Sequence, residues 1–131
     1  MSIRVVRNTL DSLERDLKAL PIVAVKDMKA CVRKAGIAGN KVAKDHATFT
    51  ARSHGKHYPN AFSVDHGAAV AGGAAAFTAA YGPDASRPQG GMSFERGSRR
   101  QPPHLDLKLS ADLMGPVFAR MVHDLPDGWF W

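Results

Sequence analysis

The stretch that decides the fold is MSFERGSRRQPPHLDL, residues 92–107. Apolar and polar residues alternate at its start, which predicts a half-buried strand over residues 91–96. Gly97 then permits a sharp turn, because glycine adopts positive φ at little cost. The pair Pro102-Pro103 ends the strand ladder, because proline has no N–H to donate. The stretch therefore predicts a strand, a turn, an extended segment and the entry to a last helix.

A β-hairpin is predicted upstream of this stretch, over residues 65–81. Two short alanine-rich runs flank Gly72-Gly73. Alanine by itself favours helix, but a glycine pair between two apolar runs is typical of a hairpin turn. A flexible loop over residues 82–91 joins the hairpin to the strand that follows. The polar loop over residues 50–64 precedes the hairpin and is anchored by its aromatic residues, Tyr58 and Phe62.

Two helices are predicted before the hairpin. Leucines recur at helical spacing over residues 9–20, which predicts an amphipathic helix with Asn8 as its N-cap. Residues 2–7 form a short strand, an arm or the lead-in to this helix. Pro21 ends it or lies in the first turn of the next helix, residues 22–47. The second helix carries an apolar seam of period 3.5, made of Val25, Met28, Val32, Ala35, Gly39 and Val42. The seam faces either the core of the same domain or a neighbouring subunit.

Positive charge gathers in the N-terminal half of the chain. Residues 1–60 carry twelve Lys or Arg against five Asp or Glu, and residues 61–131 carry six against seven. The outer faces of the second helix hold Lys26, Lys29, Arg33, Lys34, Lys41 and Lys44. Such a face most often contacts only water. The alternatives are that it faces DNA or an acidic neighbouring protein. Charge alone does not choose between these partners.

The chain ends in a predicted helix and an aromatic tail. The helix covers residues 105–125, with Ser110 as a good cap and Pro116 as a kink or restart. Residues 126–131 form a turn and a tail whose aromatic members are Trp129, Phe130 and Trp131. Large aromatic side chains are seldom left in water, so the tail docks either on the domain's own core or on a neighbouring subunit.

Cys31 and a group of three histidines are the candidates for a chemical site, and the sequence predicts no site at either. Cys31 is the only cysteine, which excludes an intramolecular disulfide and a multi-cysteine zinc site, and it fits a small buried hydrophobe. His54, His57 and His66 lie near one another in sequence. They lack cysteine partners and a His-Glu-x-x-His helix, so no metal ligand set is predicted. No nucleophile with a base partner is visible, and the sequence therefore predicts neither a catalytic residue nor a cofactor.

The charged residues of the deciding stretch are interpreted as structural. Glu95 is expected to form an ion pair or a hydrogen bond that fixes the turn. Arg96, Arg99 and Arg100 form a short basic cluster, which fits a protein interface better than a phosphate clamp. No run of the sequence reaches the roughly 18 apolar residues that span a bilayer. Charges recur through the first residues, so no signal peptide is expected either.

The same stretch resembles the tail-completion (neck) family of long-tailed bacteriophages. The matching pattern is a Glu-x-Gly-Ser turn, a Gln-Pro-Pro segment and a His before the last helix. Its residues are Phe94, Glu95, Gly97, Ser98, Gln101, Pro102, Pro103 and His104. Together with Arg99 and Arg100, these residues form the turn that is expected at subunit interfaces. The layout of the chain is also similar, and the Gly- and Pro-rich insertion at residues 82–91 departs from the family pattern.

The length and the predicted elements indicate a single α+β domain over residues 1–131, a layout that the resemblance also implies. A basic helical region, residues 1–48, and a C-terminal helix would pack on a small antiparallel sheet within residues 65–97. The resemblance further implies a structural virion protein without catalytic activity. Such proteins form a ring, commonly of six copies, at the head-proximal end of the tail. The ring joins the tail tube to the head connector and leaves a channel for DNA.

The expected partners follow from the same resemblance. They are further copies of the chain, the other neck and tail proteins (connector or stopper, terminator and tail tube) and the genomic DNA, without a membrane. The protein would be made in the bacterial host cytoplasm and end in the virion. Two alternatives stay open: a tail terminator ring protein of the same assembly, and a small basic nucleic-acid-binding protein.

Overall fold

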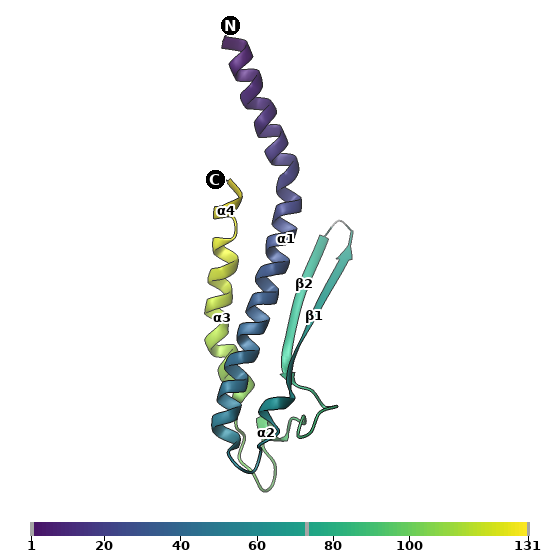
Figure 1. The fold of residues 1–131 in the computed structure, drawn as a ribbon, viewed down its shortest axis with the longest axis vertical. Helices are drawn as coiled ribbons and strands as arrows, with labels where there is room; N and C mark the ends of the chain where they lie inside the picture. The colour runs from purple at the N-terminus through teal and green to yellow at the C-terminus, as the bar shows by residue number, and fades with distance from the viewer. Residues whose placement is uncertain (1, 73, 131) are drawn as a thin grey trace.

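The chain folds into an elongated α+β structure built along one long helix (Figure 1). The computed structural model describes the backbone of residues 2–72 and 74–130, and the side chains of residues 11–72 and 74–129. Helix α1 (Ser2–Ala51) is flanked on one side by α3 (Asp106–Asp124) and on the other by the hairpin of β1 (Phe62–Ala71) and β2 (Ala74–Pro83). The N-terminal part of α1 extends beyond both neighbours.

The two predicted N-terminal helices are one continuous helix of 50 residues. The predicted break at Pro21 is therefore wrong, as are the N-cap at Asn8 and a strand over residues 2–7. Proline removes one backbone hydrogen bond and crowds the preceding turn, at a cost of about 3 kcal/mol, but the hydrogen bonds on either side persist. Helix α1 changes direction within its first half (Figure 1), and Pro21 is the residue there that produces such bends.

The buried stripe of α1 overlaps the predicted seam only in part. Val25 and Met28 are 44% and 41% exposed. The residues that α1 buries are small: Cys31, Gly36, Gly39, Ala43, Ala47 and Ala51. They recur every three to five residues, which keeps one face of a helix against its neighbours. Of the predicted seam, Gly39 is buried, Val32, Ala35 and Val42 are half-buried, and Val25 and Met28 are exposed. The neighbouring elements approach α1 where its side chains are smallest.

The hairpin prediction is confirmed. Ten residues of each strand pair in antiparallel register without a bulge, from Phe62 opposite Pro83 to Ala71 opposite Ala74. Gly72 has a φ of 56°, as a tight hairpin turn requires. The strands extend a few residues beyond the predicted range at their open end. The sheet has two strands within the described residues, so the predicted third strand does not form.

Residues 91–96 form a turn and the short helix α2 (Ser93–Arg96) instead of a strand. The Arg96 N–H donates to the Met92 carbonyl at 3.0 Å, which closes one helical turn. The Phe94 carbonyl then accepts the His104 N–H at 2.8 Å. Four alternating residues fit a strand or a single helical turn equally well. Tertiary contacts of Phe94 and Glu95, described below, select the turn.

The loop before the hairpin is shorter than predicted. Helix α1 reaches Ala51, and the short 3-10 helix η1 (Pro59–Ala61) leads into β1. The two predicted anchors are confirmed, because Tyr58 is fully buried and Phe62 is 4% exposed. Together with the alanines at the end of α1 they form the core cluster, which Tyr81, Phe94 and Leu107 border. The core thus lies at one end of the molecule.

The C-terminal helix is confirmed over Asp106–Asp124, and the predicted cap is wrong. Ser110 lies inside α3, where its hydroxyl is fully buried and donates to the Gly39 carbonyl at 2.8 Å. Pro116 is accommodated within the helix. After α3, a turn at Leu125 and Pro126 leads into α4 (Asp127–Phe130), and the Trp129 indole N–H donates to Asp27 at 2.8 Å. The tail therefore docks on its own α1 through Trp129. The side chain of Phe130 and all of Trp131 lie outside the described residues.

Gly39→Ala is expected to destabilise the protein by about 2 kcal/mol. A Cβ at this position would lie 2.5 Å from the Tyr81 ring, which is held by its hydrogen bond to Ser110. The matched control is Gly115→Ala on α3, where nothing lies within 4 Å of the added carbon. That change should leave stability unchanged or raise it by up to about 1 kcal/mol, since alanine favours helix. Urea unfolding at one fixed protein concentration measures both, and equal effects would contradict the tight α1–β2 contact.

Candidate functional site

The deciding stretch is held by a buried carboxylate. Glu95 is 7% exposed, and its two oxygens accept the backbone N–H groups of Leu107 and Lys108 at 2.9 and 3.1 Å. These donors belong to the first turn of α3, where backbone N–H groups lack helical partners and the helix dipole favours an anion. The predicted hydrogen bond that fixes the turn is thus confirmed. Its partner is the helix that follows the turn, and no arginine of the turn takes part in it.

The turn itself is a compact loop that exposes its arginines. Gly97 has a φ of 80°, and a Cβ there would lie 2.8 Å from the Pro103 nitrogen. Ser98 and Gln101 exchange backbone hydrogen bonds across the turn. The exposed residues of the loop surround an open depression: Arg96, Ser98, Arg99, Arg100, Pro102 and Pro103. The turn therefore presents three positive charges to its surroundings while its backbone is fixed.

Aromatic stacking fastens the turn to the core. Phe94 stacks on Tyr58 with ring centroids 4.5 Å apart, and it meets the His104 ring edge-on at 5.4 Å. His104 in turn lies 3.1 Å from the Gln101 amide nitrogen. Such aromatic pairs stabilise by about 0.5–1.5 kcal/mol beyond the area they bury. Phe94, Gln101 and His104 of the predicted set thus face inward, whereas the arginines face outward.

A buried polar cluster that the sequence did not predict lies beside this turn. Asp106 is fully buried, and one of its oxygens meets His46 Nδ1 at 2.5 Å and the Thr50 hydroxyl at 2.9 Å. The second oxygen lies 3.8 Å from His104 Nδ1. An aspartate that orients a histidine is common in catalysis. Within the described residues no hydrogen bond joins His46 to a hydroxyl or thiol, so the cluster joins α1 to α3 and forms no nucleophilic pair.

Sequence reasoning missed this cluster because its members lie about sixty positions apart. His46 and Thr50 are four residues apart on α1, which places both on one face of the helix. That spacing was the available signal. The spacing of His46 and Thr50 identifies a polar cluster only together with Asp106, which lies opposite them on α3.

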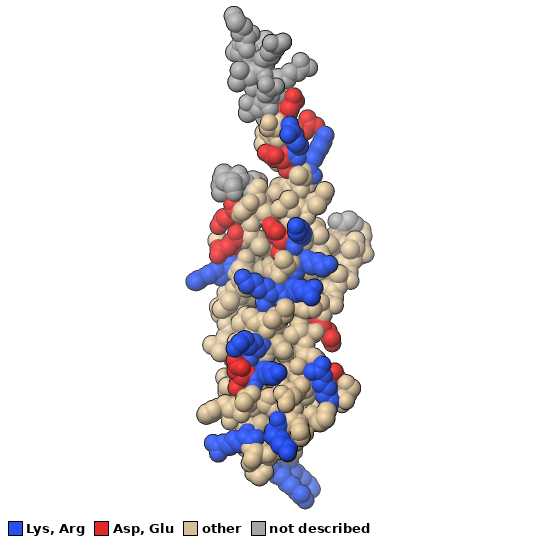
Figure 2. Space-filling view, viewed as in Figure 1, with Lys and Arg blue, Asp and Glu red and all other residues tan. Residues whose placement is uncertain are grey.

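The predicted basic residues are spread along α1 instead of forming one site. Lys26, Lys29, Arg33, Lys34 and Lys41 are exposed and Lys44 is half-buried. Lys41 is paired with Asp45 at 2.8 Å. Figure 2 shows Lys and Arg side chains spread over this face from the upper part of the molecule to its lower end, with acidic side chains among them. The structure brings Lys29 and Arg33 beside His66 and Phe77 of the hairpin, around a shallow depression.

The histidine loop and Cys31 offer no assembled site in the described part of the chain. The backbone at His54 and His57 is joined to the 82–91 loop by the Gln89 side chain. The Gln89 amide oxygen accepts the His57 backbone N–H, and its amide nitrogen donates to the His54 backbone carbonyl. No group of three His, Cys, Asp or Glu among the described residues is arranged to hold a metal ion. Cys31 is 6% exposed, and burial raises the pKa of its thiol. A buried thiol with a raised pKa is a poor nucleophile.

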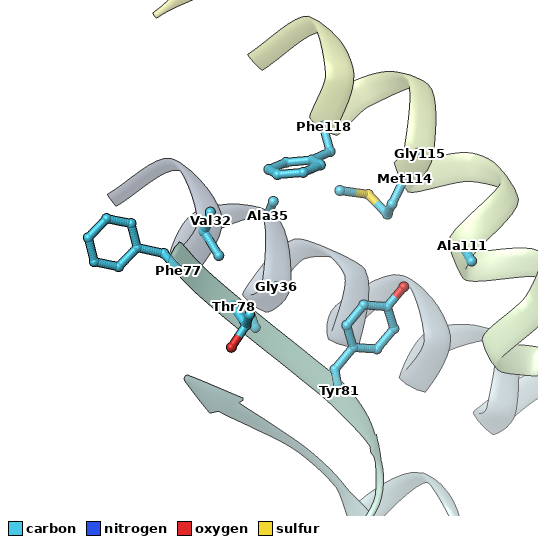
Figure 3. A pocket seen from close by; sticks show the side chains of 11 residues that line it. Val32, Ala35, Gly36, Phe77, Thr78, Tyr81, Ala111, Met114, Gly115 and Phe118 are labelled. Atoms are coloured by element: carbon cyan, nitrogen blue, oxygen red, sulfur yellow. The ribbon is translucent and has the colours of Figure 1, made fainter. Parts of the chain in front are cut away.

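An open apolar groove of about 380 Å³ lies between α1, β2 and α3 (Figure 3). Met114 and Phe118 of α3 face Val32 and Ala35 of α1 across it, and Tyr81 of β2 closes one end. Phe118 is 37% exposed. The groove therefore keeps apolar side chains of three elements in contact with water.

Comparison with protein families, with curated proteins and with solved structures finds no match for this chain. A search of the described helices also finds none that is both long enough and apolar enough to cross a membrane.

Glu95→Gln is expected to destabilise the protein by about 1 kcal/mol, because the amide loses the charge that the α3 N-terminus favours. Glu14→Gln is the control. Glu14 is exposed and pairs with the exposed Lys18, so its neutralisation should change stability by less than about 0.5 kcal/mol. Urea unfolding of both variants is the measurement. If the two changes cost the same, the Glu95 cap does not stabilise the turn.

Tyr58 is expected to make the protein sensitive to alkali. Burial raises the pKa of its hydroxyl, and the charges of Asp106 and Glu95 raise it further. A raised pKa in the folded state gives stability that is complete below the unfolded value of about 10 and is lost as the pH rises above it. Tyr58→Phe removes this loss, and it also removes a buried hydroxyl that lacks a hydrogen-bond partner in the described structure. Between pH 9 and pH 11, the midpoint of urea unfolding should therefore fall less for Tyr58→Phe than for the wild type. Equal falls in the two proteins would contradict the assignment.

Proposed function

We propose that this protein is a structural subunit of a ring at the head-proximal end of a phage tail. The ring joins the tail tube to the head connector and leaves a channel for DNA. In this proposal the chain catalyses no reaction. Its activity is to present surfaces to its own copies and to the neighbouring tail and neck proteins.

The observation that carries the proposal is the open surface of the single chain. Its accessible surface is 9783 Å² for a mass of 14.1 kDa. A folded monomer of that mass is expected to expose about 6,700 Å², so this chain exposes about 3,000 Å² more. A subunit of a ring has two neighbours. If the excess is divided equally between the two neighbours, each subunit contributes about half of it to one interface. The two subunits of an interface then bury about 3,000 Å² together, which lies in the range of obligate assemblies.

The apolar surface that remains exposed supports the same proposal. Large apolar side chains of α1 are in water along its protruding part, where Leu13 and Leu17 are 52% and 54% exposed and Ile22 is 74% exposed. Leu13 and Leu17 lie one helical turn apart, and with Leu20 they continue toward the buried stripe of α1. Exposed apolar surface of this extent marks sites of protein association.

The fixed turn supports the more specific assignment to a phage neck. Residues 94–104 carry the pattern that resembles the tail-completion family, and they form a rigid loop with three outward arginines. We propose that this turn and the 82–91 loop lie at ring contacts or line the channel. The basic face of α1 would then meet an acidic partner or the DNA in passage.

Deletion of the gene from the phage or prophage that encodes it tests the proposal. After induction, electron microscopy should find DNA-filled heads beside separate tails, and a plasmid copy of the wild-type gene should restore joined particles. Tails of abnormal length would assign the protein to the tail terminator instead. Normal joined particles without the gene would overturn the structural role.

The nucleic-acid alternative has its own measurement. A small basic nucleic-acid-binding protein would lose DNA affinity steeply as salt rises, with a slope set by the phosphates it neutralises. We expect weak binding by the isolated chain at physiological salt. Micromolar or tighter binding there, abolished by Lys29→Glu together with Arg33→Glu, would favour the alternative.

A further inference from the structure

The hairpin has two free edges whose backbone groups can be assigned. The Asp84 N–H donates to the Ala61 carbonyl at 2.8 Å, just beyond the last pair of the register. In antiparallel strands hydrogen-bonded and non-hydrogen-bonded pairs alternate. Counting from that bond, alternate residues turn their N–H and C=O groups outward, away from the other strand. In β1 these are Val64, His66, Ala68 and Val70, and in β2 they are Ala75, Phe77, Ala79 and Tyr81.

One contact at the base of the hairpin agrees with this assignment. By the same alternation, the Phe62 carbonyl points outward. The Arg87 guanidinium donates to this carbonyl at 3.5 Å. Farther along, no hydrogen bond within the described chain reaches an outward backbone group of either strand. Each edge therefore offers a row of donors and acceptors to another strand.

Neither edge carries the features that usually prevent such pairing. Natural edge strands are short, bulged or charged, with lysine the commonest protection. Here both strands have ten residues, pair without a bulge and contain no Lys or Arg. Asp65 is their only acidic residue, and Pro83 lies at the open end. A two-stranded sheet of this kind is marginal alone, and further strands stabilise it.

The apolar groove lies along the free edge of β2. Its lining takes Phe77, Thr78, Ala79 and Tyr81 from β2 and no residue from β1. The opposite wall is a stripe of α3 at helical spacing: Ala111, Met114, Gly115 and Phe118. A small-molecule site combines apolar walls with a few free polar groups. The Tyr81 hydroxyl is already bonded to Ser110, so the groove suits an extended apolar segment better than a small molecule.

We infer that this groove receives strand β1 from a second copy of the chain, which pairs with the free edge of β2. The same chain supplies a free edge of equal length, and Val70 on it is 77% exposed. Added strands of this kind gain main-chain hydrogen bonds and bury alternate side chains. The excess surface of the single chain supplies area for such an interface. A foreign strand would leave the chain's own β1 edge uncovered.

The contact is head-to-tail, because β1 of one copy meets β2 of the next. A contact between two different patches closes into a ring when its rotation returns to the starting subunit. In the ring, the neighbour's β1 would run antiparallel to β2 and extend one continuous sheet from copy to copy. The inference thus rests on the proposed ring and names the surface through which it closes.

Amide hydrogen exchange, followed by NMR on the full-length chain, tests the pairing directly. Spectra are compared at concentrations below and above assembly. The outward amides of Phe77 and Ala79 should exchange at least tenfold more slowly after assembly. The inward amides of Ala76 and Thr78, which bond within the hairpin, should be protected in both states. Assembly that leaves the exchange of the Phe77 and Ala79 amides unchanged would overturn the strand pairing and leave the ring proposal standing, whereas a chain that stays monomeric at every concentration would overturn both.

A pair of α3 variants tests the groove independently. Phe118→Arg places a charge in the groove and should weaken assembly at least tenfold, with the far-UV circular dichroism of the monomer unchanged. Val117→Arg is the matched control, since Val117 is 48% exposed and does not line the groove. Sedimentation velocity measures both. Assembly by both variants, or dissociation of both, would overturn the role of the groove.

Discussion

The close approach of β2 to α1 is the constraint on which the rest of the structure depends. A Cβ on Gly36 would lie 2.5 Å from the Ala79 methyl carbon, and one on Gly39 would meet the Tyr81 ring. At the same point the Ser110 hydroxyl donates to the Gly39 carbonyl and bonds to the Tyr81 hydroxyl, at 2.8 Å each. One small buried group therefore joins α1, α3 and β2. The hairpin can lie flat on the helix only because these positions carry no side chain.

This mode of packing explains why the single chain remains open. Glycine and alanine bring backbones together, but they bury little apolar area, and burial contributes only about 25 cal/mol per Å². The larger apolar side chains of the core are concentrated at one end, around Tyr58 and Phe62. The protruding half of α1, the groove and the hairpin edges are left in water. A ring would cover these surfaces, and their removal from water would favour the assembly that we propose.

The turn at residues 94–104 connects the core to the proposed interface. Its inner side is fixed by the Glu95 cap on α3 and by the stacking of Phe94 on Tyr58. The Asp106 cluster lies directly behind it and ties α3 to α1 through His46 and Thr50. These contacts hold the backbone of the turn, from which the arginines project, in one conformation. Binding to a partner then costs little conformational entropy, which favours a structural contact.

The sequence by itself determined the α+β class, the hairpin at Gly72-Gly73, the aromatic anchors and the C-terminal helix, because each rests on a local signal such as a turn residue or a long periodic run. The continuous course of α1 through Pro21 was not predicted, because proline fits both a helix end and a bent helix. Only the tertiary structure decided the helical turn at residues 93–96 and the roles of Asp106 and Ser110. In each of these cases two local conformations or environments were close in energy. Contacts between residues far apart in the sequence, above all those of α1 with α3 and β2, supplied the difference.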